Sequence, residues 1–121
     1  MKERTLLVYI LEEPFILIPL KLIKDKSAEK ADILVYLSIA SILHGRKWGR
    51  PFQKEIMERA KYTSTRTVLS AITHLEEIGW ATKKRRGLTQ SNIVILHQKK
   101  YQKVTPKLWK EIKDEVEEDI Y

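Results

Sequence analysis

The chain has 121 residues, of which 43% are hydrophobic and 32% are charged, and its formal net charge is +7 at pH 7. This length holds one hydrophobic core and is too short for two. The absence of cysteine excludes disulfides, thiolate metal sites and a cysteine nucleophile, and it fits a reducing cytoplasm.

The positive charge is concentrated in the middle of the chain. Residues 1–43 have six basic and six acidic groups, whereas residues 44–110 have sixteen basic and four acidic groups. Residues 111–121 reverse the sign, with one basic and six acidic groups. A concentrated cationic patch attracts phosphate groups and releases their counterions. A solvated, lysine-rich surface is the alternative interpretation of the same composition.

The N-terminal segment, residues 4–20, is expected to be extended. Arg4–Leu11 is rich in β-forming residues and predicts a strand, which an acidic pair and a proline end. Residues 15–20 predict a short extended piece, which Pro19 limits to a sheet edge. The first apolar run is too short to span a bilayer and no cleavage site follows it. We therefore expect neither a membrane anchor nor a signal peptide, and a cytoplasmic location.

A long helix is expected from residue 28 to residue 44. Ser27 is the expected N-cap, and Gly45 is the expected stop. Apolar residues cover nearly the whole circumference of this helix: Ile33, Leu34, Val35, Tyr36, Leu37, Ile39, Ile42 and Leu43. Because such a helix is buried on several sides, we expect the central helix of the domain or part of a dimer interface.

Two further helices are expected at residues 51–61 and 64–78, and they are joined by a tight turn. Pro51 suits the first position of one helix, and Gly79 ends the other. The first has apolar residues at core spacing, namely Phe52, Ile56, Met57 and Ala60. The second has one apolar stripe, formed by Val68, Ile72, Leu75 and Ile78.

The other faces of the helix at 64–78 are small, polar and hydrogen-bonding. They comprise Ser64, Thr65, Arg66, Thr67, Ser70, Thr73 and His74. Arginine can read guanine, and serine and threonine can reach bases or phosphates, so these residues suit a major groove. An ordinary amphipathic helix is the alternative, although a solvent face usually has more Glu and Lys. Ser64 could instead be only the N-cap.

Residues 80–97 predict a basic hairpin, with strands at 80–86 and 92–97. Four cations are consecutive before its loop, namely Lys83, Lys84, Arg85 and Arg86. Because side chains alternate along a strand, only two of the four share one face. Arg86, next to Gly87, is the best candidate for insertion into a minor groove. A mobile, solvated hairpin is the alternative.

A second basic set precedes and enters the helix at 51–61. It consists of Arg46, Lys47, Arg50 and Lys54. We expect these residues to contact a nucleic-acid backbone. A basic loop at residues 45–51 that makes no such contacts is nearly as good an interpretation.

Residues 105–121 predict a C-terminal amphipathic helix that begins at Thr105 and Pro106. Its apolar stripe is Leu108, Trp109, Ile112, Val116 and Ile120. The stripe is expected to pack on the domain or on a dimer partner. Lysines at its start and acids at its end oppose the helix dipole, which is explained if the lysine end faces DNA.

Several short motifs together resemble winged helix-turn-helix domains, most closely those of plasmid replication initiators and phage replisome organisers. They are Phe15-x-x-Ile18-Pro19, Glu55-Ile56, Thr67-Val68, Ile72 and Leu75-Glu76-Glu77-Ile78-Gly79-Trp80. The resemblance covers roughly residues 15–97. It implies an α+β fold, with the wing at 80–97, and binding to repeated or palindromic sites on mobile-element DNA, often as a dimer. We expect no further C-terminal domain like that of the initiators, so an accessory protein or a repressor fits better.

We therefore expect a sequence-specific double-stranded DNA-binding protein of plasmid or phage replication, transfer or transcription. It is expected to form a homodimer and to need no cofactor, metal or small-molecule ligand. The three histidines lack metal-ligand spacing and no phosphate-binding glycine loop is present, so we do not expect an enzyme. The alternative is a winged-helix protein-interaction module that does not bind DNA.

Overall fold

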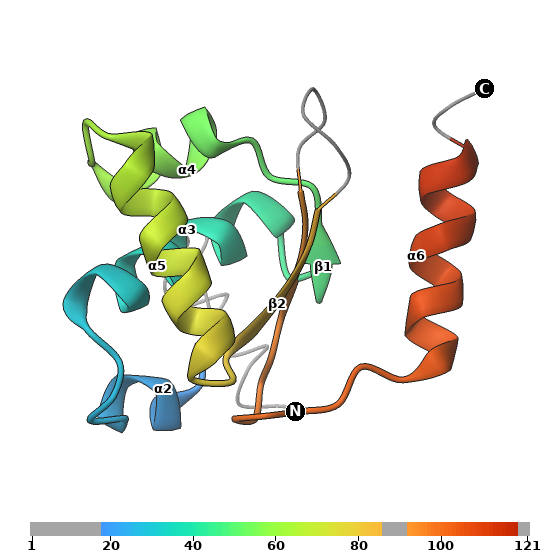
Figure 1. The fold of residues 1–121 in the computed structure, drawn as a ribbon, viewed down its shortest axis with the longest axis horizontal. Coiled ribbons are helices and arrows are strands. Elements are labelled where there is room, and N and C mark those ends of the chain that lie inside the picture. Colours follow the sequence, from blue (N-terminus) through green and yellow to red (C-terminus); the bar gives the residue numbers. More distant parts are fainter. Residues whose placement is uncertain (1–17, 86–91, 119–121) are drawn as a thin grey trace, which may run out of the picture.

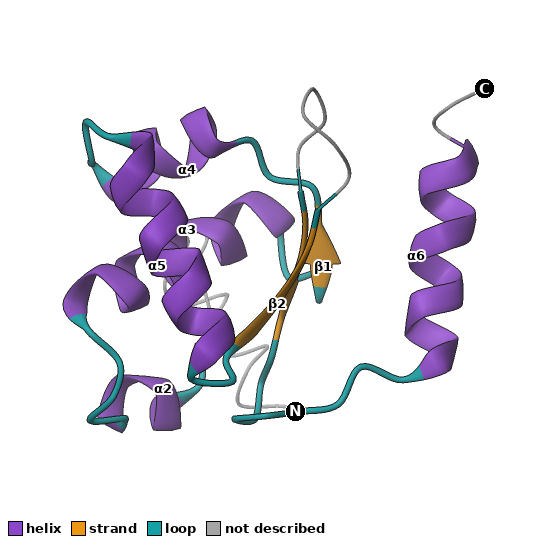
Figure 2. Cartoon of the chain, in the orientation of Figure 1, coloured by secondary structure: helices purple, strands orange, loops and turns teal. Residues whose placement is uncertain are grey.

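The computed structural model describes residues 18–85 and 92–118, where five helices accompany a three-stranded antiparallel sheet (Figures 1 and 2). In chain order the elements are α2 (Leu20–Lys24), α3 (Lys30–Leu43), β1 (Trp48–Gly49), α4 (Gln53–Ala60), α5 (Thr65–Glu77), β2 (Ala81–Lys84), β3 (Ile93–Leu96) and α6 (Pro106–Glu118). The expected α+β class is confirmed, and the arrangement is consistent with a winged-helix-like fold. In the described part of the chain, no helix is long and apolar enough to cross a membrane.

The first described element is a helix rather than an extended piece. The strand predicted at residues 4–11 lies outside the described residues, but the extended piece predicted up to residue 20 is wrong at its end. Leu20 begins α2, with Pro19 at the N-cap (φ −64°). A proline there lacks only an N–H that the helix could not use, so it favours the start of a helix. Leu22 is fully buried and anchors this turn to the core.

The long helix α3 begins two residues later than expected. Its N-cap is Glu29, which forms a capping box with Asp32, and the Glu29 N–H donates to Asp32 Oδ2 at 2.8 Å. The predicted cap, Ser27, is wrong because its N–H and hydroxyl both donate to Asp25 Oδ1. Helix α3 is nevertheless central, since it packs against both α4 and α5.

Helices α4 and α5 match the expected pair within two residues at each end. Ile56, Val68 and Leu75 are buried in the shared core with α3. Phe52 contradicts its predicted core position, because its side chain is 64% exposed. It lies at the N-cap of α4, one residue before the helical periodicity begins.

The sheet has a third strand that the sequence did not predict. Its order is β1-β3-β2, and β1 lies within the predicted basic loop, with Trp48 paired to Ile95. Gly49 permits this strand to approach α3, since a Cβ there would lie 2.2 Å from the Leu43 side chain. Strand β1 has only two residues, which is too few to show the alternation that predicts a strand. It is recognised as a strand only because it pairs with β3.

The two faces of the sheet bury different partners. Val94 and Leu96 of β3 belong to the main core with the helices, whereas Ile93 and Ile95 belong to a second cluster with Trp48 and Ile112. This alternation follows from the two-residue period of a strand. The second cluster places the apolar side of α6 on the outer face of the chain's own sheet (Figure 1).

Candidate nucleic-acid interface

Helix α5 presents a polar face in its first three turns. Ser64 is the N-cap, and its Oγ accepts the Arg66 N–H at 3.2 Å. Among the predicted contact residues of this helix, Ser64, Thr65, Arg66, Ser70 and Thr73 are exposed and Thr67 is half-buried. The acidic residues of α5 are confined to its last turn. The exposed face is therefore neutral to positive where a nucleic-acid backbone would approach.

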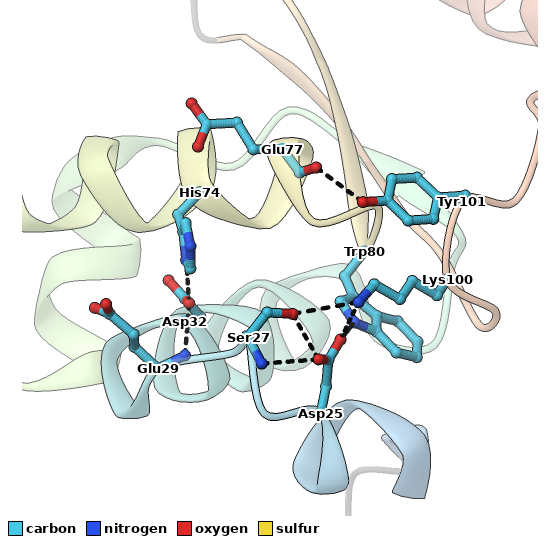
Figure 3. A network of polar contacts seen from close by, with 9 residues as sticks. All are labelled: Asp25, Ser27, Glu29, Asp32, His74, Glu77, Trp80, Lys100 and Tyr101. Atoms are coloured by element: carbon cyan, nitrogen blue, oxygen red, sulfur yellow. Dashed lines mark hydrogen bonds and ion pairs between the residues drawn. The ribbon is translucent and has the colours of Figure 1, made fainter.

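His74, another predicted contact residue, is bonded to a buried carboxylate. Its Nδ1 lies 2.5 Å from Oδ2 of Asp32, the same buried carboxylate that caps α3 (Figure 3). The hydrogen bond to Asp32 raises the pKa of His74, against an opposing effect of desolvation. His74 therefore fixes α5 against the start of α3. A role in direct contact stays a prediction.

The C-terminal end of α5 is held by a network around Asp25 (Figure 3). The Trp80 indole N–H donates to Asp25 Oδ2 at 2.8 Å, and Lys100 Nζ lies 2.9 Å from the same oxygen. The Ser27 N–H and hydroxyl occupy the other oxygen. The Ser27 hydroxyl, then Trp80 and Lys100, hold the pKa of Asp25 well below its usual range.

Tyr101 completes this end of the helix. Its hydroxyl donates to the Glu77 carbonyl at 3.3 Å, and its N–H donates to the Gly79 carbonyl at 2.7 Å. Gly79 has φ +88°, and a Cβ there would lie 2.5 Å from the Tyr101 ring. Glycine is therefore required both by the backbone conformation and by the close approach of the ring.

The two described lysines of the predicted wing point to opposite faces of the sheet. Lys83 faces α5: its N–H donates to Glu76 Oε2 at 2.8 Å, and its Nζ lies 3.4 Å from Thr73 Oγ1. Lys84 faces α6, with its Nζ 5.3 Å from the ring centroid of Trp109. Lys83 therefore extends the polar face of α5, whereas Lys84 rests on the outer helix.

Of the two arginines that follow, Arg85 is within the described residues and Arg86 is not. Arg85 is exposed directly after β2. Arg86 lies outside the described residues, so its role at a minor groove stays a prediction.

Arg46 of the second basic set is engaged by α6. Its Nη2 lies 3.0 and 3.1 Å from the two carboxylate oxygens of Glu115, and its guanidinium lies 5.0 Å from the centroid of the Trp48 ring. Both partners of the ion pair remain about half exposed. Glu115 therefore occupies part of the Arg46 guanidinium and neutralises its charge.

The other members of this set are dispersed. Lys47 is exposed at the sheet edge, where its carbonyl accepts the Leu96 N–H at 2.8 Å. Lys54 is exposed in the first turn of α4, and Arg50 is half-buried. The four cations of this set thus differ in exposure, and Arg46 is paired with Glu115.

Sequence reasoning missed the contacts that three residues make with predicted site residues, namely Asp32, Trp109 and Glu115. The Glu29 and Asp32 spacing is a capping-box signal that could have been found. The contacts from α6 had no local signal, because they join residues about 25 or more positions apart.

No protein-family model matches this sequence, and no curated protein matches it. Among solved structures, the chain is similar to a Rep–DNA complex, at 20% identity over 90% of this chain and 92% of that chain, with a TM-score of 0.56. It is also similar to the N-terminal domain of a DNA-binding protein, at 21% identity over 89% and 90%, with a TM-score of 0.52. At such identities the likeness concerns the fold.

Proposed function

We propose that this protein is a winged helix-turn-helix protein that binds double-stranded DNA in a sequence-specific manner. In this proposal α4 and α5 are the helix-turn-helix, and α5 enters the major groove. The hairpin of β2 and β3 is the wing, which contacts phosphates or a minor groove. The similar folds belong to a Rep–DNA complex and to a DNA-binding protein, which supports this choice.

The single observation that carries the proposal is the face shared by α5 and β2. Arg66, Ser70 and Thr73 are exposed on the helix, and Lys83 lies beside Thr73 from the neighbouring strand. Hydrogen-bonding side chains with cations at their border suit base edges flanked by phosphates. The opposite side of α5 is fully committed to the core.

We further propose an accessory or regulatory role in replication, transfer or transcription of a plasmid or phage, in the cytoplasm and as a homodimer. The role in a plasmid or phage is supported by the resemblance to replication initiators and by the fold shared with a Rep–DNA complex. Dimers are common among proteins that bind palindromic sites, where protein symmetry matches DNA symmetry. The proposal includes no catalytic activity.

The first experiment is selection of bound fragments from sheared source DNA at two salt concentrations. Enrichment of one locus with repeated sequences is the expected result, and its neighbouring genes would identify the process. Salt-sensitive binding without enrichment would replace the proposal by an architectural role. Absence of binding at low salt would favour a winged-helix protein-interaction module.

Substitution of Arg66 by lysine tests whether α5 reads bases. The positive charge remains, but the planar fork that pairs with guanine is lost. Affinity for the selected site should fall by about 1–3 kcal/mol while affinity for unrelated DNA stays the same. An equal loss on both DNAs would show that α5 only positions the protein.

The wing is tested by changing Lys83, Lys84, Arg85 and Arg86 together to glutamine. Each lost phosphate contact should reduce the slope of log affinity against log salt by up to about 0.9. A matched control changes Lys21, Lys24, Lys26 and Lys30, which are exposed on α2, in the turn after it and at the start of α3. Equal slopes in both variants would exclude a specific role of the wing.

A further inference from the structure

The proposed interface leaves a large part of the positive charge unused. Residues 97–110 contain five lysines and no acidic residue. Lys100 is paired with Asp25, but Lys99, Lys103, Lys107 and Lys110 are exposed and have no ion pair among the described residues. Adjacent like charges repel one another, so this arrangement is favourable when an anion approaches.

Three lysines from different segments meet at one recess, here called the lysine recess. It has a volume of about 430 Å³ and lies between the end of β3, the β3–α6 connection and the first turns of α6. Lys47 comes from the sheet edge, Lys103 from the connection and Lys107 from α6. Glu111 is the one carboxylate that lines it, so the recess is net positive.

The other polar residues of the recess make it rich in hydrogen-bond donors. Gln102 Oε1 accepts the backbone N–H groups of Gln98 and Lys99, at 3.1 and 3.4 Å. These bonds occupy the acceptor of the amide, so its NH₂ group remains as a donor. Thr105 Oγ1 accepts the Leu108 N–H at 3.2 Å, which leaves its hydroxyl hydrogen to donate. Donors and ammonium groups together suit phosphate oxygens.

The lysine recess is far from the polar start of α5. Tyr101, in the same connection, bonds to Glu77 and Gly79 at the C-terminal end of α5, whereas Ser64 caps the opposite end. A helix of this length spans about 20 Å at 1.5 Å per residue. In Figure 1 the connection runs along the lower edge, away from the start of α5 beside α4. A short duplex held by the start of α5 would not need the recess.

We propose that the lysine recess binds a second stretch of nucleic-acid phosphodiester backbone, in addition to the stretch bound by α5. The inference rests on the proposed function and names a second contact surface for the same class of partner. The stretch is either a flanking part of the same duplex or part of another duplex. Its recognition is by charge and is independent of sequence.

The test uses the full chain and the variant K103Q/K107Q, with K21Q/K24Q as a control of equal charge change. Affinity is measured by anisotropy on a short duplex that covers only the selected site and on the same site with long flanks. A third measurement asks whether protein held on an immobilised duplex captures a second, labelled duplex. Poly-glutamate is offered in the same capture format.

We expect K103Q/K107Q to match the wild type and the control on the short duplex. On flanked DNA or in duplex capture it should lose affinity, with a salt slope lower by up to about 1.8 for two contacts. If the variant loses affinity for flanked DNA, the second stretch belongs to the same duplex. If it loses duplex capture, the second stretch belongs to another duplex.

The inference is overturned if K103Q/K107Q behaves like K21Q/K24Q in both assays, or if the recess lysines affect only capture of poly-glutamate. Failure of the proposed function is distinguishable, because the wild type would then bind none of the duplexes. An Arg66→Ala variant that loses the short duplex while K103Q/K107Q retains it separates the two surfaces.

Discussion

Asp25 shows how one carboxylate can secure a helix end. It joins the turn before α3 to Trp80 and to Lys100, and its side chain is only 10% exposed. Its removal leaves the buried Trp80 indole N–H without its acceptor, and such an unsatisfied donor costs about 1–3 kcal/mol. We expect Asp25→Ala to lower the free energy of unfolding by that amount at neutral pH, measured by urea denaturation. Asp114→Ala, on the exposed side of α6, is the control.

The contribution of Asp25 should also depend on pH. Its folded-state pKa lies below the unfolded value of about 3.9, so its stabilisation is present above that value and is lost as pH falls through the folded pKa. The stability difference between wild type and Asp25→Ala should therefore shrink in acid. A difference that is constant down to the acid limit of folding would contradict this assignment.

His74 predicts the opposite pH dependence. The hydrogen bond to Asp32 raises its pKa, with further help from the charges of Asp32, Glu29 and Glu77 and against desolvation. The resulting stabilisation is fully present below the unfolded pKa of about 6.5 and is lost as pH rises through the folded pKa. We expect wild type to exceed His74→Gln in stability more at pH 6 than at pH 9. Thermal unfolding across this range is the measurement, and an equal difference at both pH values would contradict it.

At the scale of elements, α6 holds two cations that the proposed function assigns to DNA. It engages Arg46 through Glu115 and Lys84 through Trp109, and both cations were predicted to contact the nucleic acid. The Arg46–Glu115 pair is about half exposed, and such a pair contributes about 1 kcal/mol or less to stability. Under the proposed function, removal of this pair should change DNA binding more clearly than stability, because it frees the Arg46 guanidinium for a phosphate.

We therefore expect Glu115→Gln to strengthen DNA binding and to increase the salt slope by up to about 0.9, with little change in stability. Asp114→Asn removes the same charge from an exposed neighbour and is the matched control. Filter binding across a salt series measures both. If the two variants strengthen binding equally, only the overall charge of α6 matters.

At the scale of the whole molecule, α6 gives the sheet a second covered face. Ile112 is 2% exposed and packs with Ile93, Ile95 and Trp48. Loss of a buried isoleucine side chain costs about 2–5 kcal/mol, so Ile112→Ala should lower the free energy of unfolding by that amount. Ile23→Ala makes the same change at a side chain that is 51% exposed, and it should be nearly neutral.

The same experiment bears on self-association. Because Ile112 packs within its own chain, the unfolding midpoint of wild type should not change with protein concentration through this cluster. A midpoint that rises with concentration and loses this rise in Ile112→Ala would show that α6 also stabilises a dimer. Sedimentation of both proteins at micromolar concentration is the independent check.

Local sequence was sufficient for the helices that form the candidate site. The apolar spacing of Val68, Ile72 and Leu75 predicted α5, and Ser64 supplied its cap, because both signals lie within a few residues. Alternation in a strand also predicted that adjacent lysines separate, as Lys83 and Lys84 do. Local sequence was less reliable for the ends of helices. Phe52 is exposed and α3 starts late, because competing caps shift a boundary by one or two residues.

Contacts between distant segments were decided only by the tertiary structure. Strand β1 exists because β3 pairs with it, and α6 covers the sheet because Ile93 and Ile95 need a partner on their face. The helical periodicities, the cap of α5 and the uneven charge follow from the amino-acid sequence alone, because all three are local properties. The sequence did not determine that Arg46 meets Glu115 or that Lys47, Lys103 and Lys107 share a recess. Those pairings depend on how the packed elements bring together residues dozens of positions apart.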